Sequence, residues 1–156
     1  MIGMKLKRFA LAALACAAAI APAQAQTDFS YSAVSPGSWS YRAVTGGTEA
    51  VFADSSGATR MSIACGKTTR LVTLSRISAA PAANISIWTS SSARTLASRF
   101  NQPSGRVIAQ VGATDSLLDA IVFSRGRFAI SMPGAPALVL PTSPEVDHVV
   151  EDCRAA

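Results

Sequence analysis

Histidine is almost absent from the 156-residue chain, in which His148 is the only one. One histidine excludes a metal site built on a histidine cluster. The sequence also lacks a G-x-S-x-G segment, which would mark a hydrolase serine. The segment GKTT at 66–69 has Met61 where a phosphate-binding loop requires its first glycine. We therefore predict a protein without cofactor, without metal and without enzymatic activity.

Long apolar runs are missing after the first 25 residues. Those residues carry Lys5, Lys7 and Arg8, then an apolar run over 9–20 and a small-residue A-x-A site at 23–25. A basic head, a short apolar middle and an A-x-A site are typical of a secretory signal peptide. The run is shorter than the roughly 20 residues that cross a bilayer.

Cleavage after Ala25 predicts export to the periplasm or the external medium. No second apolar stretch of about 20 residues follows, so we expect no transmembrane segment in the mature form. The alternative is a lipoprotein anchored through Cys16. Against it, Ala13 stands where such sites usually carry leucine, and the apolar run continues past Cys16. We therefore expect an unlipidated protein.

Charged residues are scarce, at 15% of the chain. The net charge of +5 includes Lys5, Lys7 and Arg8, which leave with the signal peptide. Eleven of the 14 basic residues then remain against nine acidic ones, a net charge of +2. So small an excess predicts no nucleic-acid partner.

Cysteine is also rare, with Cys65 and Cys153 the two that follow the signal peptide. Cys65 lies on the same face of 59–65 as Met61 and Ile63, and Cys153 falls on the valine face of a C-terminal helical pattern. Both therefore point inward, in a protein sent to an oxidising compartment. We predict a Cys65–Cys153 disulfide, which would stabilise the fold by about 4–5 kcal/mol for so long a loop. The alternative is two buried free thiols.

The chain after Ala25 is long enough for one domain. Residues 26–38 are polar and include Pro-Gly, which predicts a flexible leader before a single β-rich domain at 39–156. Short apolar runs between Gly, Pro, Asn and Ser predict antiparallel strands. These runs lie at 39–44, 49–53, 59–65, 70–76, 84–89, 94–100, 106–111, 127–132 and 137–141.

Two segments near the C-terminus have helical signals. Asp115 precedes 116–125 as an N-cap, and Gly126 follows that segment. The segment 142–153 begins with the capping-box spacing of Thr142 and Glu145. The predicted fold class is α+β: an antiparallel sheet or sandwich of about seven to nine strands, with two short helices near the C-terminus.

Aromatic and cationic residues are the candidates for binding. Trp88 shares the polar face of 84–89 with Ser86, and an aromatic side chain on a polar face favours binding. Arginine clusters could meet phosphate or an acidic polysaccharide, because the guanidinium fork fits such groups. We predict a non-enzymatic binding or structural module for an envelope or extracellular partner. Its candidate contact residues are Trp88, Arg94, Arg99, Arg125 and Arg127.

Two alternatives stay open. A small envelope hydrolase would use Asp115, Asp119 or His148 as its acid and base. An inhibitor of an envelope or host enzyme would present a rigid loop at 89–94 or 101–106. The sequence leaves the oligomeric state open.

Several segments together resemble a group of small secreted alphaproteobacterial proteins without an assigned activity. These segments are WSY, SIAC, LLDAIVFSRGRFAI, LVLP and PEVDHVVEDCR. The closing run is more remotely similar to the invasion-associated locus B type of periplasmic domain, which also ends on a helix carrying a cysteine. This chain departs from that type in having one cysteine pair after its signal peptide. The resemblance implies the compartment and the fold, and no catalytic residue.

Overall fold

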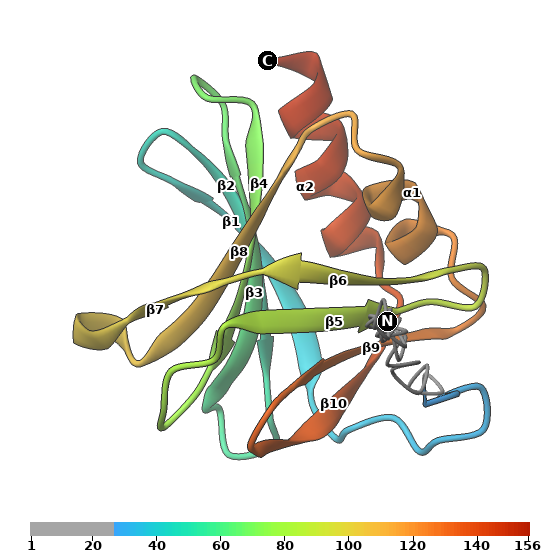
Figure 1. Cartoon of the computed structure of the whole chain (residues 1–156). Coiled ribbons are helices and arrows are strands. Elements are labelled where there is room, and N and C mark those ends of the chain that lie inside the picture. The colour runs from blue at the N-terminus through green and yellow to red at the C-terminus, as the bar shows by residue number, and fades with distance from the viewer. Residues whose placement is uncertain (1–26) are drawn as a thin grey trace, which may run out of the picture.

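The computed structural model describes residues 27–156, which form ten strands and two α-helices (Figure 1). The predicted signal peptide, its cleavage site after Ala25 and Cys16 lie outside the described residues. In chain order the elements are β1 (Ser38–Val44), β2 (Gly47–Ala53), β3 (Thr59–Gly66), β4 (Leu71–Ile77), β5 (Asn84–Trp88), β6 (Ala93–Ala97), β7 (Arg99–Asn101), the 3-10 helix η1 (Gln102–Ser104), β8 (Arg106–Gly112), α1 (Ser116–Val122), β9 (Arg127–Met132), β10 (Ala135–Pro141) and α2 (Pro144–Ala155).

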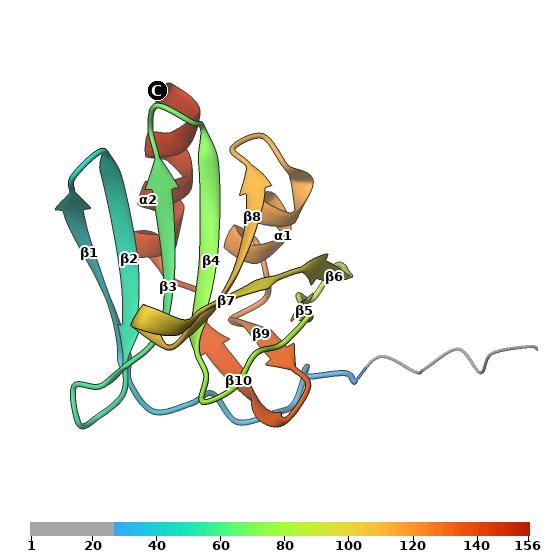
Figure 2. The ribbon, with the colours of Figure 1, turned by 60° about the vertical axis from the view of Figure 1, so that its left-hand side comes forward.

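The strands form two antiparallel sheets, which confirms the predicted α+β class (Figure 2). Sheet A has the order β1-β2-β3-β4-β8-β7, and sheet B has the order β10-β9-β5-β6. There are ten strands because the predicted strand at 94–100 is divided at Ser98. The amide of Ser98 donates to the Ala83 carbonyl (3.0 Å) and its hydroxyl to the Ala82 carbonyl (2.8 Å). These bonds turn the chain from β6 in sheet B to β7 in sheet A.

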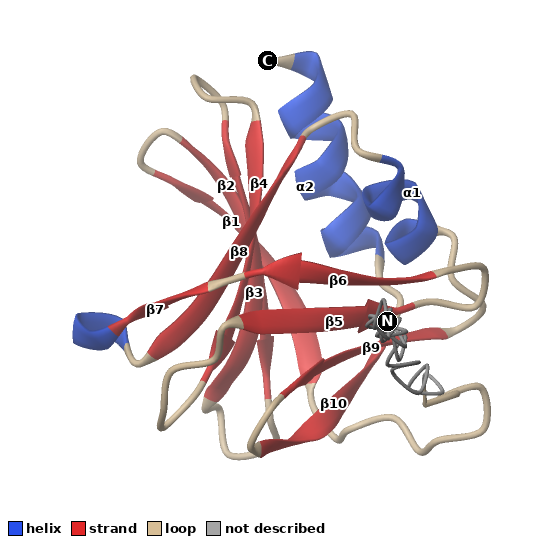
Figure 3. Cartoon of the chain, viewed as in Figure 1, coloured by secondary structure: helices blue, strands red, loops and turns tan. Residues whose placement is uncertain are grey.

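The inner face of sheet A carries most of the core. Met61, Ile63 and Cys65 alternate along β3 and are all buried, as the strand periodicity predicts. One end of this face is covered by α2, which packs against β1 to β4. The other end is covered by sheet B, where Phe128 stacks on Trp39 with 6.2 Å between ring centroids. Figure 3 shows both α-helices on the same side of sheet A.

The N-cap of α2 is Ser143, one residue after the Thr142 cap predicted from the sequence. The Ser143 hydroxyl accepts from the Glu145 amide (3.3 Å) and donates to the Glu145 carboxylate. Pro144 explains the shift, because proline fits the first helical position and holds the preceding residue extended. The predicted buried face is confirmed, since Val146, Val149, Val150 and Cys153 are all buried.

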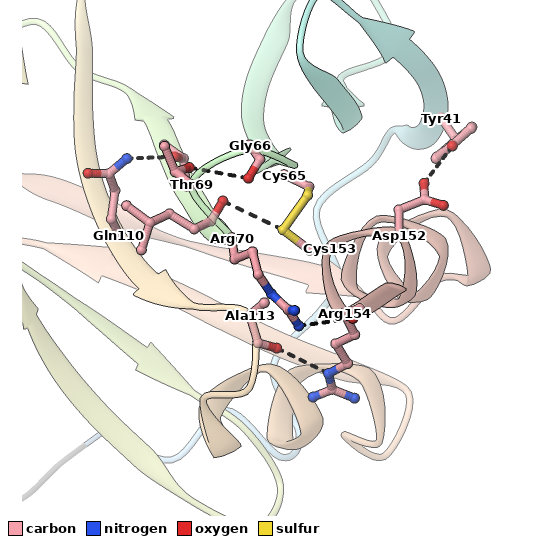
Figure 4. Close-up of a disulfide and its surroundings, with 12 residues drawn as sticks. Tyr41, Cys65, Gly66, Thr69, Arg70, Gln110, Ala113, Asp152, Cys153 and Arg154 are labelled. Carbon is pink, nitrogen blue, oxygen red and sulfur yellow. Dashed lines mark hydrogen bonds between the residues drawn. A yellow bond between two sulfur atoms is a disulfide. The ribbon is translucent and has the colours of Figure 1, made fainter. Parts of the chain in front are cut away.

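A disulfide joins β3 to α2 through Cys65 and Cys153, as predicted, and is shown in Figure 4. The two residues are 88 positions apart, and their Cα atoms are 5.4 Å apart. Two further contacts hold this end of α2: the Arg154 Nε donates to the Ala113 carbonyl (3.1 Å) and the Arg70 Nη2 to the Arg154 carbonyl (2.9 Å). The C-terminal helix is therefore fixed to sheet A covalently and by side-chain hydrogen bonds.

Residues 27–37 contain no helix or strand and contact sheet B. The Phe29 ring meets Trp88 edge-on at 5.9 Å between centroids, and the Ser35 amide donates to the Val139 carbonyl (2.8 Å). The Arg127 guanidinium also donates to the Ser32 carbonyl. The flexibility expected of 26–38 stays a prediction, and these contacts show where the segment lies. Neither α-helix in residues 27–156 is long and apolar enough to cross a membrane.

The two faces of α2 give a stability prediction. Val149 is fully buried, whereas His148 is exposed with its ring edge-on to Tyr41. Val149→Ala should lower the free energy of unfolding by about 1–3 kcal/mol through lost transfer and packing energy. His148→Ala should change it by at most about 0.5 kcal/mol, the usual range for surface substitutions. Urea denaturation of both oxidised variants checks this, and a larger effect at His148 would contradict it.

Candidate functional site

The candidate binding residues do not gather into one surface. Trp88 and Arg127 lie against the segment 27–37, as described above. Arg99 lies on β7 and lines a small hollow of about 280 Å³ with residues of β6 and β8. Arg94 follows the serine-rich connection between β5 and β6 in the sequence, and the Arg125 amide donates to the hydroxyl of Ser90 in that connection. A larger hollow lies beside this connection and is lined in part by Arg125.

Arg94 forms an ion pair with Asp115, the N-cap of α1. The guanidinium donates two hydrogen bonds to the carboxylate, of 2.6 and 2.7 Å. The same carboxylate accepts from the Leu117 amide (2.8 Å), so it caps the helix as predicted. Hydrogen bonding to Arg94 is the main cause that lowers the pKa of Asp115. The pair therefore joins β6 to the start of α1, and its charges largely neutralise each other.

Phe123 is exposed because of where α1 ends. The helix buries Leu117, Leu118 and Ile121, and stops at Val122, three residues before the predicted end of 116–125. At about 100° per residue, Phe123 falls on the side opposite the buried arc. It is 78% exposed, whereas the next most exposed large apolar side chain among residues 38–156 is 41% exposed. A phenylalanine so far out of the core has no packing role of its own there.

A hollow of about 550 Å³ adjoins the Phe123 ring. Its walls are Phe123 and Arg125, the serine-rich connection and part of α1; we call this set the Phe123 surface. The full set is Ser90, Ser91, Ser92, Ser116, Asp119, Ala120, Phe123 and Arg125. The Arg125 side chain makes no ion pair within residues 27–156. The surface thus combines an aromatic ring, hydroxyl groups and a free cation.

Hydrogen bonds between the two loops hold this surface in shape. The Ser90 amide donates to the Ser124 hydroxyl (2.9 Å), and the Arg125 amide donates to the Ser90 hydroxyl (2.9 Å). Ser124 is buried and also donates to the Arg127 carbonyl. Within the serine connection, the Ser92 amide donates to the Thr89 hydroxyl (3.0 Å). The turn that carries Phe123 is therefore ordered before any partner arrives.

The three residues considered for a hydrolase have different partners and do not line one hollow. Asp115 is paired with Arg94, and Asp119 accepts from the Arg154 Nη2 (2.7 Å). Asp119 lines the Phe123 hollow, but Asp115 and His148 do not. His148 instead lies on α2 beside Tyr41.

Tyr41 and Asp152 form a polar pair between β1 and α2. The Tyr41 hydroxyl donates to the Asp152 carboxylate (2.7 Å), as Figure 4 shows. This bond is the main cause that lowers the pKa of Asp152 and raises that of Tyr41. It links the edge strand β1 to α2. Over residues 27–156, no group of three or more His, Cys, Asp or Glu side chains is arranged to hold a metal ion.

No protein-family model, no curated protein and no solved structure matches the chain. The resemblance to small secreted alphaproteobacterial proteins therefore stays a prediction. Sequence reasoning missed Phe123, although a signal was present: in a helix that buries Leu117, Leu118 and Ile121 on one face, Phe123 falls on the other.

The Arg94–Asp115 pair predicts an acid-dependent loss of stability. The folded-state pKa of Asp115 lies below its unfolded value of about 3.9, so the stabilisation is present above about pH 4 and is lost as the pH falls through the folded-state pKa. In Arg94→Gln the pKa of Asp115 returns toward the usual value. The decrease in the free energy of unfolding between about pH 6 and 3 should then be smaller than in the wild type by up to about 1 kcal/mol, the range for exposed ion pairs. Urea denaturation at both pH values measures it.

Arg99→Gln is the matched control, because Arg99 makes no ion pair in residues 27–156. Its acid-dependent loss should equal that of the wild type. Equal losses in the wild type and in Arg94→Gln would show that the pair contributes nothing to the pH dependence.

Proposed function

We propose that this protein is an exported, non-enzymatic binding module that docks a partner protein through the Phe123 surface. The observation that carries the proposal is the 78% exposure of Phe123 on a turn locked by hydrogen bonds. Aromatic and arginine side chains are enriched among the residues that dominate protein–protein affinity. Phe123 and Arg125 supply one of each, at the same hollow.

Burial of the Phe123 ring would supply the main favourable term. Moving an exposed phenylalanine out of water contributes about 1.5–3 kcal/mol. The entropy cost of ordering the loops is already met in the free protein, because Ser90 and Ser124 cross-link them. A rigid surface of this kind loses less on binding than a flexible loop would.

Charge indicates what the partner presents. Asp119, the one acidic residue of the surface, is paired with Arg154, so it does not neutralise Arg125. The partner should therefore place a carboxylate near Arg125 and an apolar recess over Phe123. Such an electrostatic match directs the orientation and the rate of association more than the final affinity.

Export is part of the proposal. A signal peptide at 1–25 would direct the chain to the periplasm or the medium. The Cys65–Cys153 disulfide is consistent with an oxidising compartment outside the cytoplasm. The partner would accordingly be an envelope or extracellular protein.

An inhibitor is a second candidate, and the β7–β8 connection favours it. This connection projects from the body of the molecule (Figure 1). It is held by the Asn101 side chain, which accepts from the Ser104 amide (3.3 Å), and by the Gly105 amide, which donates to the Gln102 carbonyl (3.2 Å). A rigid projecting loop could enter the cleft of a target enzyme.

The test is capture of partners from an envelope extract by the oxidised mature protein. Phe123→Ser should lose the captured protein, or weaken binding by about tenfold or more, the cost of losing one buried aromatic side chain. Arg125→Ala should weaken it by less and should reduce its salt dependence. Affinities of purified partner measured by calorimetry give these ratios.

Tyr31→Ser is the matched control, because Tyr31 is an aromatic residue with 98% exposure outside the Phe123 surface. It should bind like the wild type. If Phe123→Ser keeps full affinity while variants in 101–105 lose it, the inhibitor candidate replaces the Phe123 surface. If Tyr31→Ser loses as much as Phe123→Ser, the binding is nonspecific adhesion of exposed aromatics.

A further inference from the structure

A second hollow lies where the two sheets part, away from the C-terminal end of α2. Its volume is about 470 Å³, and its walls come from the ends of β3 and β4, the β4–β5 connection and the β9–β10 turn. Figures 1 and 2 both place these two connections together at the lower end of the molecule. We call it the open-end cavity. Its size falls within the roughly 300–1,000 Å³ typical of small-molecule sites.

An arginine stands in this cavity on the apolar face of a central strand. Arg76 belongs to β4 and is only 6% exposed. Its cross-strand neighbours Met61 and Val107 are fully buried, and so is Leu74 on the same face. The alternation of β4 therefore directs a charged side chain to a position where the fold otherwise buries apolar groups.

The guanidinium of Arg76 is held by backbone carbonyls of sheet B. One Nη donates to the Ile130 carbonyl (2.8 Å), and the other donates to the Pro136 carbonyl. A shift in the β9–β10 register between Ala135 and Leu138 sets Pro136 outside the regular ladder, which leaves its carbonyl for Arg76. These bonds fix the position of the positive charge, but two neutral carbonyls do not cancel it.

No described carboxylate compensates Arg76. None of the ion pairs within residues 27–156 includes it. The second charged residue of the cavity is Arg60, which is half-exposed and reaches Asp54 at 3.7 Å. Burial and, to a lesser degree, the charge of Arg60 lower the pKa of Arg76. None of the residues that line the cavity is acidic. The ion-pair partner of Arg60, Asp54, lies outside the lining, and Arg76 has no ion pair within residues 27–156.

The remaining wall is mostly apolar and offers few hydrogen-bond donors. It includes Ile77, Pro81, Met132 and Ala135. The hydroxyl of Ser78 is already used, since it donates to the Ala80 carbonyl (2.6 Å). A heavily hydrated dianion would lose more hydrogen bonds to water than this wall can replace. A carboxylate with an apolar body fits both features, because the guanidinium fork matches a carboxylate and the body would leave water.

We propose that the open-end cavity binds a small organic acid, with its carboxylate at Arg76 and Arg60 and its apolar body against Met132 and Ala135. This site is independent of the Phe123 surface, with which it shares no residue. A mostly apolar cavity in which a few placed polar groups orient the ligand is typical of small-molecule sites.

The probe is octanoate, with 1-octanol as a neutral ligand of the same chain length and inorganic phosphate as a hydrated anion. Isothermal calorimetry on the oxidised mature protein at about pH 7, where the acid is ionised, gives each affinity. Octanoate should bind saturably below about 1 mM, and at least about tenfold more tightly than 1-octanol, the ratio expected for one charge-assisted hydrogen-bonded pair. Octanoate should also raise the Tm of the protein.

Arg76→Gln should weaken octanoate at least about tenfold and leave 1-octanol within about twofold, because an amide keeps a donor but no charge. Arg60→Gln, at a more exposed position, should weaken octanoate less. Arg106→Gln is the matched control. Arg106 is half-buried on the outer face of the same sheet, where it donates to the Ser62 and Ser75 hydroxyls (3.0 and 2.9 Å), and it does not line the cavity. Its octanoate affinity should equal that of the wild type.

Three results would overturn the proposal: no saturable octanoate binding to the wild type, equal affinities for octanoate and 1-octanol, or unchanged octanoate affinity in Arg76→Gln. Tighter binding of phosphate, in competition with octanoate, would overturn the assignment to a carboxylate. If Arg76→Gln does not fold, Arg60→Gln and the comparison of the two octyl ligands decide. Loss of partner binding in Phe123→Ser with octanoate binding intact would separate the two surfaces.

Discussion

The inner face of sheet A has to be covered along its whole length, and two different elements share that task. At one end α2 lies across β1 to β4, and at the other sheet B brings Phe128 onto Trp39. The Cys65–Cys153 bridge anchors α2 to sheet A at the residue where the valine face of the helix meets β3.

The two ends of sheet B are where both candidate sites lie. The short helix α1 fills the space beside α2, and it ends where Ser124 bonds to the β5–β6 connection, which turns Phe123 outward. At the opposite end, Arg76 of sheet A reaches sheet B with hydrogen bonds to the Ile130 and Pro136 carbonyls. The fold therefore leaves one hollow at each end of sheet B, one beside an aromatic ring and one beside a buried charge.

The periodicity of the sequence predicted the elements well where burial alone decides them. Alternation in 59–65 and the valine spacing of α2 placed Cys65 and Cys153 inward, and so predicted their bridge. Periodicity failed where a side-chain hydrogen bond decides the backbone. Ser98 divides one predicted strand between two sheets, and Ser124 ends α1 early. The local sequence around these two serines looks like that of serines in ordinary turns. Their hydrogen-bond partners lie far along the chain, so no local pattern marks them.

The arginines show the same limit in the candidate sites. Ten of the eleven cationic residues after Ala25 are arginine, and a sequence reading counts them all as surface charge. Most are used inside the structure: Arg94 donates with both Nη atoms to Asp115, Arg106 donates with one Nη to two serine hydroxyls, and Arg154 donates to Asp119. A planar fork with several donors suits such ties better than the point charge of a lysine. What matters for binding is therefore the few guanidinium groups that these ties leave uncompensated. Arg125 is such a group at the surface, and Arg76 is such a group in the interior. A count of charges along the sequence distinguishes neither of them from the other arginines.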